Sequence, residues 1–279
     1  MYEILLRDDL VPQIHLFKLN APNVARKAQA GQFVIIRIDE QGERIPLTIA
    51  DWNRDEGSVS VVFMEVGTTT HRLALLKAGD SIANFIGPLG LPTHIEEFGT
   101  VACVAGGFAV ATIFPIARTM RKAGNRVISI MGARTKNLIF WEEELGNTSD
   151  QLIVTTDDGS YGRKGLVTEP LKELLEAGGI DRVIAIGPSI MMKFAAKTTE
   201  PFGVKTIVSL NPIMVDGTGM CGCCRVSVDG QTRFTCVDGP DFDGHEVDWD
   251  LLLARQKIYL DEEKSSFEEW QHKCGRCSK

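Results

Sequence analysis

Five short apolar runs, separated by helix-like stretches, occupy residues 98 to about 210 and restrict the fold of this chain more than any other feature. The stretches 111–123 and 166–177 have the apolar spacing of helices. Strands that alternate with helices favour a parallel, doubly wound sheet. The five runs are residues 101–105, 127–131, 152–156, 183–186 and 206–210.

The segments on either side of this region have a different rhythm. Residues 1–97 contain short branched runs, such as 32–38 and 58–66, separated by turn residues, and this pattern is typical of a small β barrel. Residues 211–248 are rich in cysteine, glycine and aspartate, and residues 249–279 begin amphipathic and end polar. We therefore expect four units, with boundaries after residues 97, 210 and 248.

Composition excludes several classes of protein. Hydrophobic residues make up 44% of the chain and charged residues 24%, as in ordinary globular proteins, and the net charge of -7 does not favour nucleic-acid binding. The longest uncharged run, 101–117, is broken by glycine and proline and is too short to span a membrane. The first residues lack the pattern of a signal peptide. We expect a soluble, cytoplasmic protein without membrane or nucleic-acid partners.

Four of the seven cysteines lie between residues 221 and 236, which suggests metal or redox chemistry. Asp216, Cys221, Cys224 and the more distant Cys236 have the spacing of a plant-type [2Fe–2S] site, with aspartate in the first ligand position. Three glycines between Asp216 and Cys224 let the backbone approach a cluster closely. We predict these four residues as metal ligands.

Two alternatives stay open for this cluster, and a separate cysteine pair lies in the tail. Cys223 stands close enough in sequence to replace Cys221 or Cys224 as a ligand. The four thiols also suit zinc, although zinc sites usually come as two separated pairs. Cys274 and Cys277 form a second pair near the end of the chain, where a frayed tail is as reasonable as a site.

A glycine pair follows the first predicted strand of the parallel sheet and precedes a helix. Such a turn lets backbone N–H groups and the helix dipole meet a pyrophosphate, although it also serves simply to pack a strand against a helix. Later strand ends reach the same edge of the sheet, where open α/β sheets bind ligands. The predicted nucleotide-binding residues are Gly106, Gly107, Val110, Gly132, Ala133, Arg134, Asp157, Asp158, Gly187 and Pro188.

Two segments of the β half suit a flavin, although each also reads as an ordinary turn. Arg44 can pair with a phosphate, and the hydroxyl of Thr48 can hydrogen-bond a flavin ring nitrogen. Farther on, a strand closes with glycine and three hydroxyl residues, which suits a phosphate. The predicted flavin-binding residues are Arg44, Pro46, Leu47, Thr48, Glu65, Val66, Gly67 and Thr70.

The order of these motifs over residues 1 to about 250 resembles the ferredoxin–NADP reductase superfamily. Within it, the chain is most similar to electron-transfer subunits of dihydroorotate dehydrogenase B and to small (alpha) subunits of NADH-dependent ferredoxin:NADP oxidoreductase. Asp216 in a cysteine position resembles the second group. Two departures are that Arg44 precedes Thr48 by four residues instead of three, and that Ala109 replaces a third glycine.

The resemblance implies FAD between the barrel and the nucleotide domain, NAD(H) over the flavin, and a [2Fe–2S] cluster near a larger partner. It implies that Thr48 lies near flavin N5, that Pro46 and Leu47 pack on the flavin ring, and that Gly67 and Thr70 hold the FAD pyrophosphate. Gly106, Gly107 and the turn after them would serve NAD(H), with the Arg134 and Asp158 side chains near the nucleotide.

The resemblance further implies an oxidoreductase subunit with no catalytic side chains beyond its cofactors. It would exchange hydride with NAD(H) and single electrons with a larger FAD/[4Fe–4S] flavoprotein that bifurcates electrons and contacts ferredoxin and NADP(H). A partner that oxidises dihydroorotate is the nearest alternative. A zinc-stabilised docking or regulatory module is an alternative of another class. Residues 249–259 would either dock the partner or pack on the chain's own core.

Overall fold

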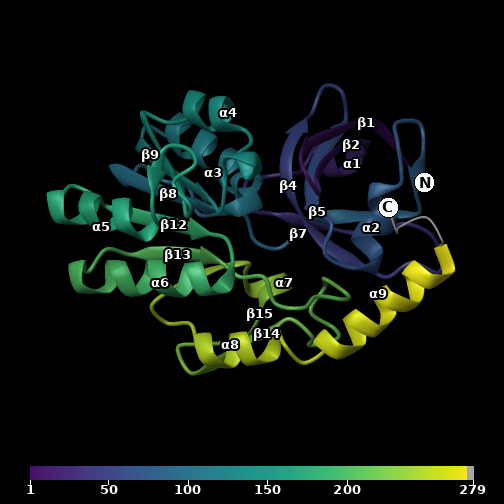
Figure 1. Ribbon diagram of the computed structural model, residues 1–279. Coiled ribbons are helices and arrows are strands. Elements are labelled where there is room, and N and C mark those ends of the chain that lie inside the picture. Colours follow the sequence, from purple (N-terminus) through teal and green to yellow (C-terminus); the bar gives the residue numbers. More distant parts are fainter. Residues whose placement is uncertain (275–279) are drawn as a thin grey trace.

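The structure is a computed structural model that describes residues 1–274 (Figure 1). A β barrel lies beside an α/β unit, and the C-terminal segments run beneath both. No helix in the described part of the chain is both long and apolar enough to cross a membrane. The Cys274 and Cys277 pair, for which a site and a frayed tail were both open, extends beyond the described residues.

The first sheet is an antiparallel barrel that is nearly closed. Its strand order is β6-β1-β2-β5-β4-β3-β7, and the two outermost strands, β6 and β7, are separated in the chain only by Ala83. Its interior is filled by aliphatic and aromatic side chains, including Phe17 and Phe63, whose rings pack edge to face at 5.0 Å. The strands are β1 (Tyr2–Val11), β2 (Ile14–Asn20), β3 (Phe33–Arg37), β4 (Ile45–Asn53), β5 (Ser58–Met64), β6 (Ser81–Ile82) and β7 (Asn84–Leu89).

Two short helices interrupt the barrel strands. Helix α1 (Pro22–Ala25) begins with proline, which is pre-organised for a first helical turn. Helix α2 (Thr68–Ala74) begins after Gly67 and packs Leu73 into the barrel core.

The second sheet has the order β11-β10-β9-β8-β12-β13-β16, and all its pairs except β13–β16 are parallel. The five predicted runs form its central strands, which confirms the doubly wound α/β prediction. They are continuous apolar runs because helices cover both faces of the sheet. The strands are β8 (Thr100–Gly106), β9 (Arg126–Ala133), β10 (Gln151–Thr156), β11 (Arg163–Lys164), β12 (Arg182–Ile186), β13 (Thr206–Ser209) and β16 (Asp241–Asp243).

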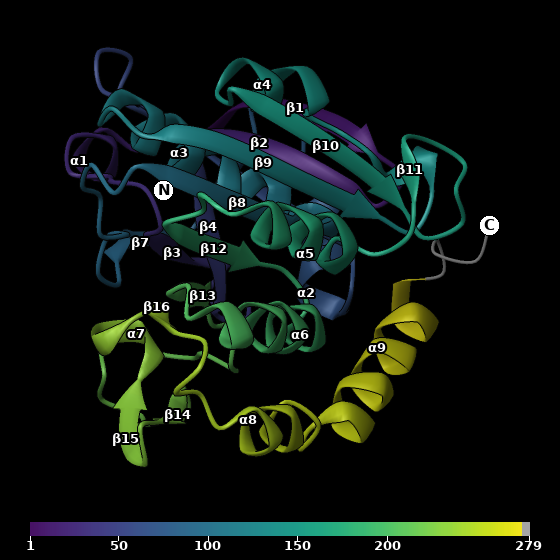
Figure 2. The same ribbon diagram turned by 90° about the vertical axis from the view of Figure 1, so that its left-hand side faces the viewer.

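The helices divide between the two faces of this sheet (Figure 2). On one face α3 (Val110–Lys122) and α4 (Glu142–Asn147) pack beside the barrel, with Ile113 fully buried. On the other face α5 (Thr168–Ala177) and α6 (Ser189–Thr199) cover the strands with Leu171 and Met192. Short 3-10 turns are η1 (Gly107–Ala109), η2 (Lys136–Leu138) and η3 (Glu200–Phe202).

The cysteine-rich segment has some regular structure of its own. A hairpin of β14 (Arg225–Val228) and β15 (Gln231–Phe234) precedes the turn α7 (Thr235–Asp238). Strand β16 then returns to the α/β sheet and pairs antiparallel with β13. Val226 and Val228 extend the core beneath α5 and α6, so this segment is joined to the nucleotide unit by packing as well as by the chain.

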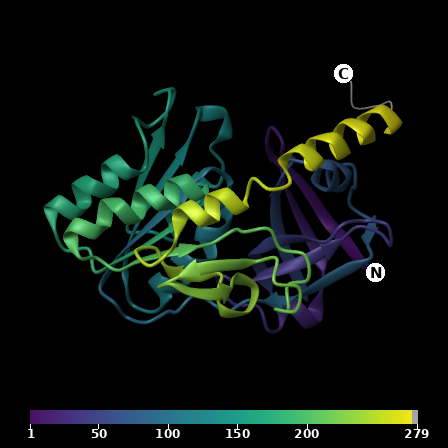
Figure 3. The same cartoon turned by 90° about the horizontal axis from the view of Figure 1, so that it is seen from below.

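Two helices end the described chain (Figure 3). Helix α8 (Trp249–Arg255) buries Trp249 and Leu252 in the core beneath α6, and it leaves Leu251 44% exposed. Helix α9 (Leu260–Cys274) continues from α8 toward the barrel, where Phe267 stacks on His71 of α2 at 4.6 Å. Of the two readings of residues 249–259, packing on the chain's own core is therefore correct for Trp249 and Leu252.

Candidate cofactor cleft and thiol pair

A cleft of about 390 Å³ separates the barrel from the α/β sheet. Pro46, Leu47 and Thr48 line it from strand β4, and Gly187 and Pro188 line it from the end of β12. All five are predicted site residues, and they come from segments more than a hundred positions apart in the chain. A cleft of this volume between two units is a common site for cofactors.

The wall of this cleft is largely apolar. Its few polar side chains are hydroxyls and one amide, and none of its lining residues carries an ionisable side chain. A wall of this kind suits a planar aromatic ring, and it presents no group positioned for general acid–base catalysis. The chemistry at this site therefore depends on what is bound there.

The glycine pair after β8 combines the two roles that the sequence left open. A Cβ on Gly106 would lie 2.6 Å from the sulfur of Met191 on α6 and 3.1 Å from Pro188, so this glycine allows the close packing of the strand against α6. Gly107 has a φ of +60°, and a Cβ there would meet nothing within 4 Å. Gly107 thus leaves open space beside the backbone at the start of η1, where a dinucleotide can approach closely.

We expect Gly107→Val to raise the Kd for NADH by about tenfold or more, because a branched side chain fills the space that a pyrophosphate needs and adds about 1–2 kcal/mol of backbone strain. Gly179→Val is the matched control, since Gly179 also has a positive φ and open space but lies in a turn before β12. NADH titration followed by flavin fluorescence measures both. An equal loss in the control variant would assign the effect to strain alone.

The other predicted nucleotide residues gather at the same edge of the sheet. Gly132 pairs with Gly106 in the parallel register, and Asp157 donates its backbone N–H to the Ala133 carbonyl at 3.0 Å. A Cβ on Gly132 would clash with Val167, so this glycine serves packing.

Two charged side chains at this edge, Arg134 and Asp158, are exposed. The Asp158 N–H donates to the Arg134 carbonyl at 3.3 Å, so the two residues are neighbours. A hydrogen bond from Ser160 lowers the pKa of the Asp158 carboxyl and keeps it charged. Their role toward a nucleotide stays a prediction.

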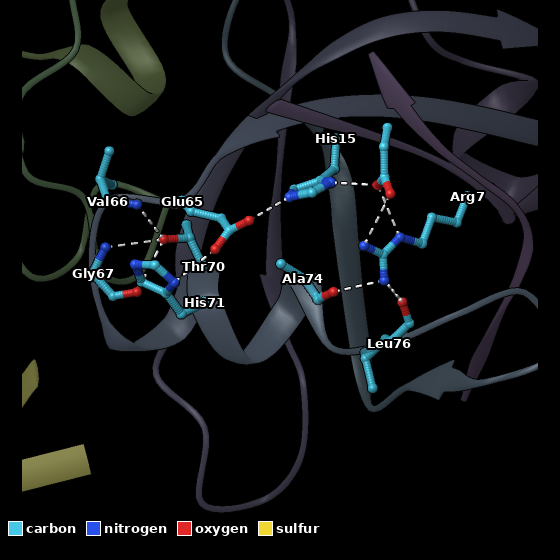
Figure 4. Close-up of polar contacts among 10 residues, drawn as sticks. Arg7, His15, Glu65, Val66, Gly67, Thr70, His71, Ala74 and Leu76 are labelled. Carbon is cyan, nitrogen blue, oxygen red and sulfur yellow. Dashed lines mark hydrogen bonds and ion pairs between the residues drawn. The ribbon is translucent and has the colours of Figure 1, made fainter. Parts of the chain in front are cut away.

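Glu65 does not line the cleft, and both of its carboxylate oxygens are held by histidines (Figure 4). Oε1 lies 2.6 Å from Nε2 of His15, and Oε2 lies 2.7 Å from Nδ1 of His71. His15 in turn reaches Asp9 through its other ring nitrogen at 2.6 Å. This arrangement fixes the end of β5 against α2, and it leaves Glu65 a supporting position beside the cleft.

The start of α2 is capped by its own threonine (Figure 4). The Thr70 hydroxyl accepts hydrogen bonds from the N–H groups of Val66 and Gly67, at 2.9 and 3.1 Å, and donates to the Gly67 carbonyl at 3.0 Å. Val66 and Thr70 line the cleft, whereas Gly67 lies between them. The structure therefore places these residues at the cleft mouth, and their contact with an FAD pyrophosphate stays a prediction.

Two of the four predicted metal ligands lie together. The sulfur atoms of Cys224 and Cys236 are 3.2 Å apart, and each residue is only 2% exposed. Cys221 is exposed and Cys223 is half-buried. Within residues 1–274, no three cysteine, histidine or acidic side chains are close enough to hold one metal ion, so the full ligand set stays a prediction.

The side chains around these thiols are of the types that bind iron in iron–sulfur clusters. Cys224 and Cys236 are buried, adjacent and unbonded, and burial raises the pKa of the Cys236 thiol to about 12, so iron would be needed to hold it as thiolate. Backbone N–H groups lower the pKa of Cys221. Asp216 accepts hydrogen bonds from the Thr218 N–H and hydroxyl, which lower its pKa.

Arg44 lies on this side of the molecule, since its positive charge also lowers the pKa of Asp216. Its side chain is exposed and does not line the cleft. The structure thus places this predicted phosphate ligand nearer to a predicted cluster ligand than the sequence suggested, and its phosphate role stays a prediction.

The thiol pair and the cleft share part of their walls. Phe33 and Met214 pack against Cys224 and Cys236, and the same two side chains line the cleft. Phe33 and Met214 would therefore contact a cofactor in the cleft as well as the residues that would hold a cluster. A shared wall of this kind suits electron transfer between two bound cofactors.

Several lining residues were not among the predicted ones. Phe108 and Thr112 follow the glycine pair, and their position just after a strand end could have identified them as cleft residues. Ser209 and Asn211 lie at the carboxyl end of β13, which is the same sheet edge as the other strand ends. No sequence pattern predicts Gly31 as a cleft residue, because its position in the cleft depends on how the barrel closes.

Comparisons with known proteins agree with this geometry. Residues 211–248 match the model of the iron–sulfur cluster binding domain of dihydroorotate dehydrogenase B. The chain is 48% identical, over 98% of its length and 96% of the relative, to a dihydroorotate dehydrogenase B (NAD(+)) electron transfer subunit homolog from Thermotoga maritima. It is 31% identical, over 86% of its length and 95% of the relative, to such a subunit from Desulforamulus reducens.

Two solved structures are also similar. One is a chain from work on flavin-based electron bifurcation by an NADH-dependent reduced ferredoxin-NADP oxidoreductase, with 48% identity, a TM-score of 0.92, and coverage of 97% of this chain and 98% of that one. A ferredoxin NADP+ reductase from Neisseria gonorrhoeae shares the fold at 16% identity and a TM-score of 0.60, over 73% of this chain and 91% of that one.

These likenesses confirm the predicted resemblance, the predicted fold and the prediction of an NAD(P)H-dependent oxidoreductase subunit. At the level of the family they also bear out the predicted cofactors, FAD, an iron–sulfur cluster and NAD(H). The chain belongs to the family of dihydroorotate dehydrogenase B electron-transfer subunits.

Proposed function

We propose that this protein is the electron-transfer subunit of an NADH-dependent ferredoxin:NADP oxidoreductase. It exchanges hydride with NAD(H) at FAD and single electrons with a larger FAD/[4Fe–4S] flavoprotein through a [2Fe–2S] cluster. Ferredoxin and NADP(H) are reached only through that partner. The observation that carries the proposal is the shared wall of Phe33 and Met214, which joins the cofactor cleft to the thiol pair.

Bound FAD supplies the chemistry that links a two-electron hydride donor to a one-electron acceptor. The chain's own residues position the cofactors. Thr48 presents its side chain to the cleft from β4, and Pro46 and Leu47 form an apolar bed beside it. Gly107, next to the lining residue Phe108, leaves open space for the dinucleotide.

The cluster loop is suited to meet a partner. Cys221 is exposed, and its neighbour Met220 is 87% exposed. Val215 and Val237 add further exposed apolar surface around the same loop. Electrons would thus leave the protein at the face where Cys221 reaches the surface.

The second candidate is the electron-transfer subunit of dihydroorotate dehydrogenase B itself, which the family model of residues 211–248 favours. The two candidates differ in the partner and share all cofactors in this chain. Asp216 in the place of a cysteine and the extent of the likeness to the oxidoreductase chain support the first candidate.

The first experiment is anaerobic purification followed by a visible spectrum and assays of iron, zinc and acid-labile sulfide, before and after addition of NADH. We expect flavin bands, about two irons and two sulfides per chain, and bleaching by NADH. A colourless protein that holds zinc and ignores NADH would instead support the docking-module alternative. Co-purification with a flavoprotein that reduces ferredoxin, or with one that oxidises dihydroorotate, decides between the two candidates.

A further inference from the structure

One buried carboxyl group stands behind the wall of the cofactor cleft. Asp241 begins β16, and its Oδ2 accepts a hydrogen bond from the Thr93 hydroxyl at 2.7 Å. Its Oδ1 is buried and has no hydrogen-bond partner among the described residues. A buried carboxyl oxygen without a hydrogen-bond partner lowers the stability of the folded protein, so its presence needs an explanation.

Asp241 lies between two cavities. On one side Ser209, its register partner on β13, lines the cofactor cleft, and its hydroxyl faces the Asp241 carboxyl. On the other side Asp241 and Thr93 line a second cavity of about 550 Å³, which is large enough to hold water. The carboxyl therefore has the cleft on one side and a polar cavity on the other.

The chemistry of the proposed function requires a proton path at this place. Oxidation of one NADH to NAD+ releases two electrons and one proton, whereas an iron–sulfur cluster accepts the electrons alone. One proton must therefore leave the cleft for each NADH oxidised, and one must enter for each NAD+ reduced. No ionisable side chain lines the cleft, so a side chain that accepts this proton would stand behind its wall.

We propose that Asp241 is the residue that holds this proton, at Oδ1, and passes it between the cleft and the second cavity by way of the Ser209 hydroxyl. This inference rests on the proposed electron transfer. Asp241 is a positioning and proton-holding group, and it does not line the cleft itself.

The protonation behaviour of Asp241 agrees with this role. Burial raises the pKa of its carboxyl from 3.8 to about 6, against the opposing effect of the nearby Thr93 and Ser209 hydroxyls. The carboxyl thus changes its charge close to neutral pH. The charged and titratable groups that line the second cavity are His94, Arg182, Lys205, Arg233, Asp238, Asp243 and Glu246.

The test separates the two halves of the reaction in the intact, cofactor-loaded protein by anaerobic stopped flow. NADH reduces the flavin in the first half, and ferricyanide takes the electrons one at a time in the second. We expect Asp241→Asn to leave the first half unchanged and to slow the second by about a hundredfold, the lower range of what a positioned proton acceptor contributes.

Glu246→Gln is the matched control, because Glu246 lines the same second cavity, is exposed, and loses the same charge. It should leave both halves unchanged. Ser209→Ala keeps the carboxyl but removes the hydroxyl between it and the cleft, so it should slow the second half as Asp241→Asn does. If Asp241→Asn does not fold, Ser209→Ala still tests whether the proton path exists.

A readout without turnover is the pH dependence of the melting temperature. Since the folded protein holds the Asp241 proton more tightly than the unfolded chain, stability is lost as pH rises from 3.8 through about 6. Asp241→Asn should remove this decline, whereas Ser209→Ala and Glu246→Gln should retain it.

Normal re-oxidation in Asp241→Asn, an equal slowing in Glu246→Gln, or an unaffected Ser209→Ala would overturn the proposed path. These failures differ from a failure of the proposed function. If the proposed function is wrong, NADH will not reduce the flavin of the wild-type protein. If only the proton path is wrong, NADH will reduce the wild-type flavin and the variants alone will contradict the proposal.

Discussion

Cys236→Ala is expected to abolish cluster binding while the flavin stays bound. Its sulfur lies 3.2 Å from that of Cys224 in a buried site, so its loss leaves one thiol of this pair for iron. Iron and sulfide should fall from about two per chain to near zero. Reduction of the flavin by NADH should persist, because the cleft wall is formed by other residues. Iron, sulfide and FAD assays together with the visible spectrum measure the outcome.

Two further alanine variants serve as controls. Cys103 is fully buried in strand β8, so Cys103→Ala removes the same atom from a core position away from the thiol pair. It should keep its iron. Cys223→Ala tests the alternative ligand, and we expect it to keep iron as well, because the predicted ligands are Asp216, Cys221, Cys224 and Cys236. Full iron in Cys236→Ala, or its loss in Cys223→Ala, would require a different ligand set.

The parallel sheet was predictable from the sequence, and its strands lie within two residues of the expected runs. Strand β8, expected at 101–105, extends over Thr100–Gly106. These strands are buried on both faces, so their apolar runs are continuous and bounded by polar turns. The glycine pair and the thiol loop were predictable for another reason, since each depends on residues close together in the chain.

The remaining features depend on pairings that local sequence does not encode. Glu65 meets His15 across 50 positions, because β2 and β5 are neighbours in the barrel. Strand β16 has only three residues, too few for a periodic signal, yet its pairing with β13 places Asp241 opposite Ser209. The predicted joining of Asp216 and Cys221 to the thiol pair would depend on iron, which supplies bonds that the chain alone lacks.

Trp249→Ala should destabilise the protein by about 3–5 kcal/mol, because it empties a large buried volume. Trp249 is 8% exposed and packs beside Leu252 in the core beneath α6, and its indole N–H donates to the Gly244 carbonyl at 2.9 Å. A loss of this size is a large part of the 5–15 kcal/mol that typically holds a domain folded. The free energy of unfolding is measured by urea unfolding, monitored by far-ultraviolet circular dichroism because this signal does not depend on the tryptophan that is removed.

Leu251 on the same helix is the control, since it is 44% exposed. Leu251→Ala should change the free energy of unfolding by no more than about 0.5 kcal/mol. The two variants also separate core packing from partner docking. Deletion of residues 249–259 would not separate these roles, because it also removes Trp249 from the core. If α8 docks a partner, its exposed face must do so, and Leu251→Glu then weakens partner binding while stability is unchanged. Partner binding that survives Leu251→Glu would confine α8 to the chain's own core.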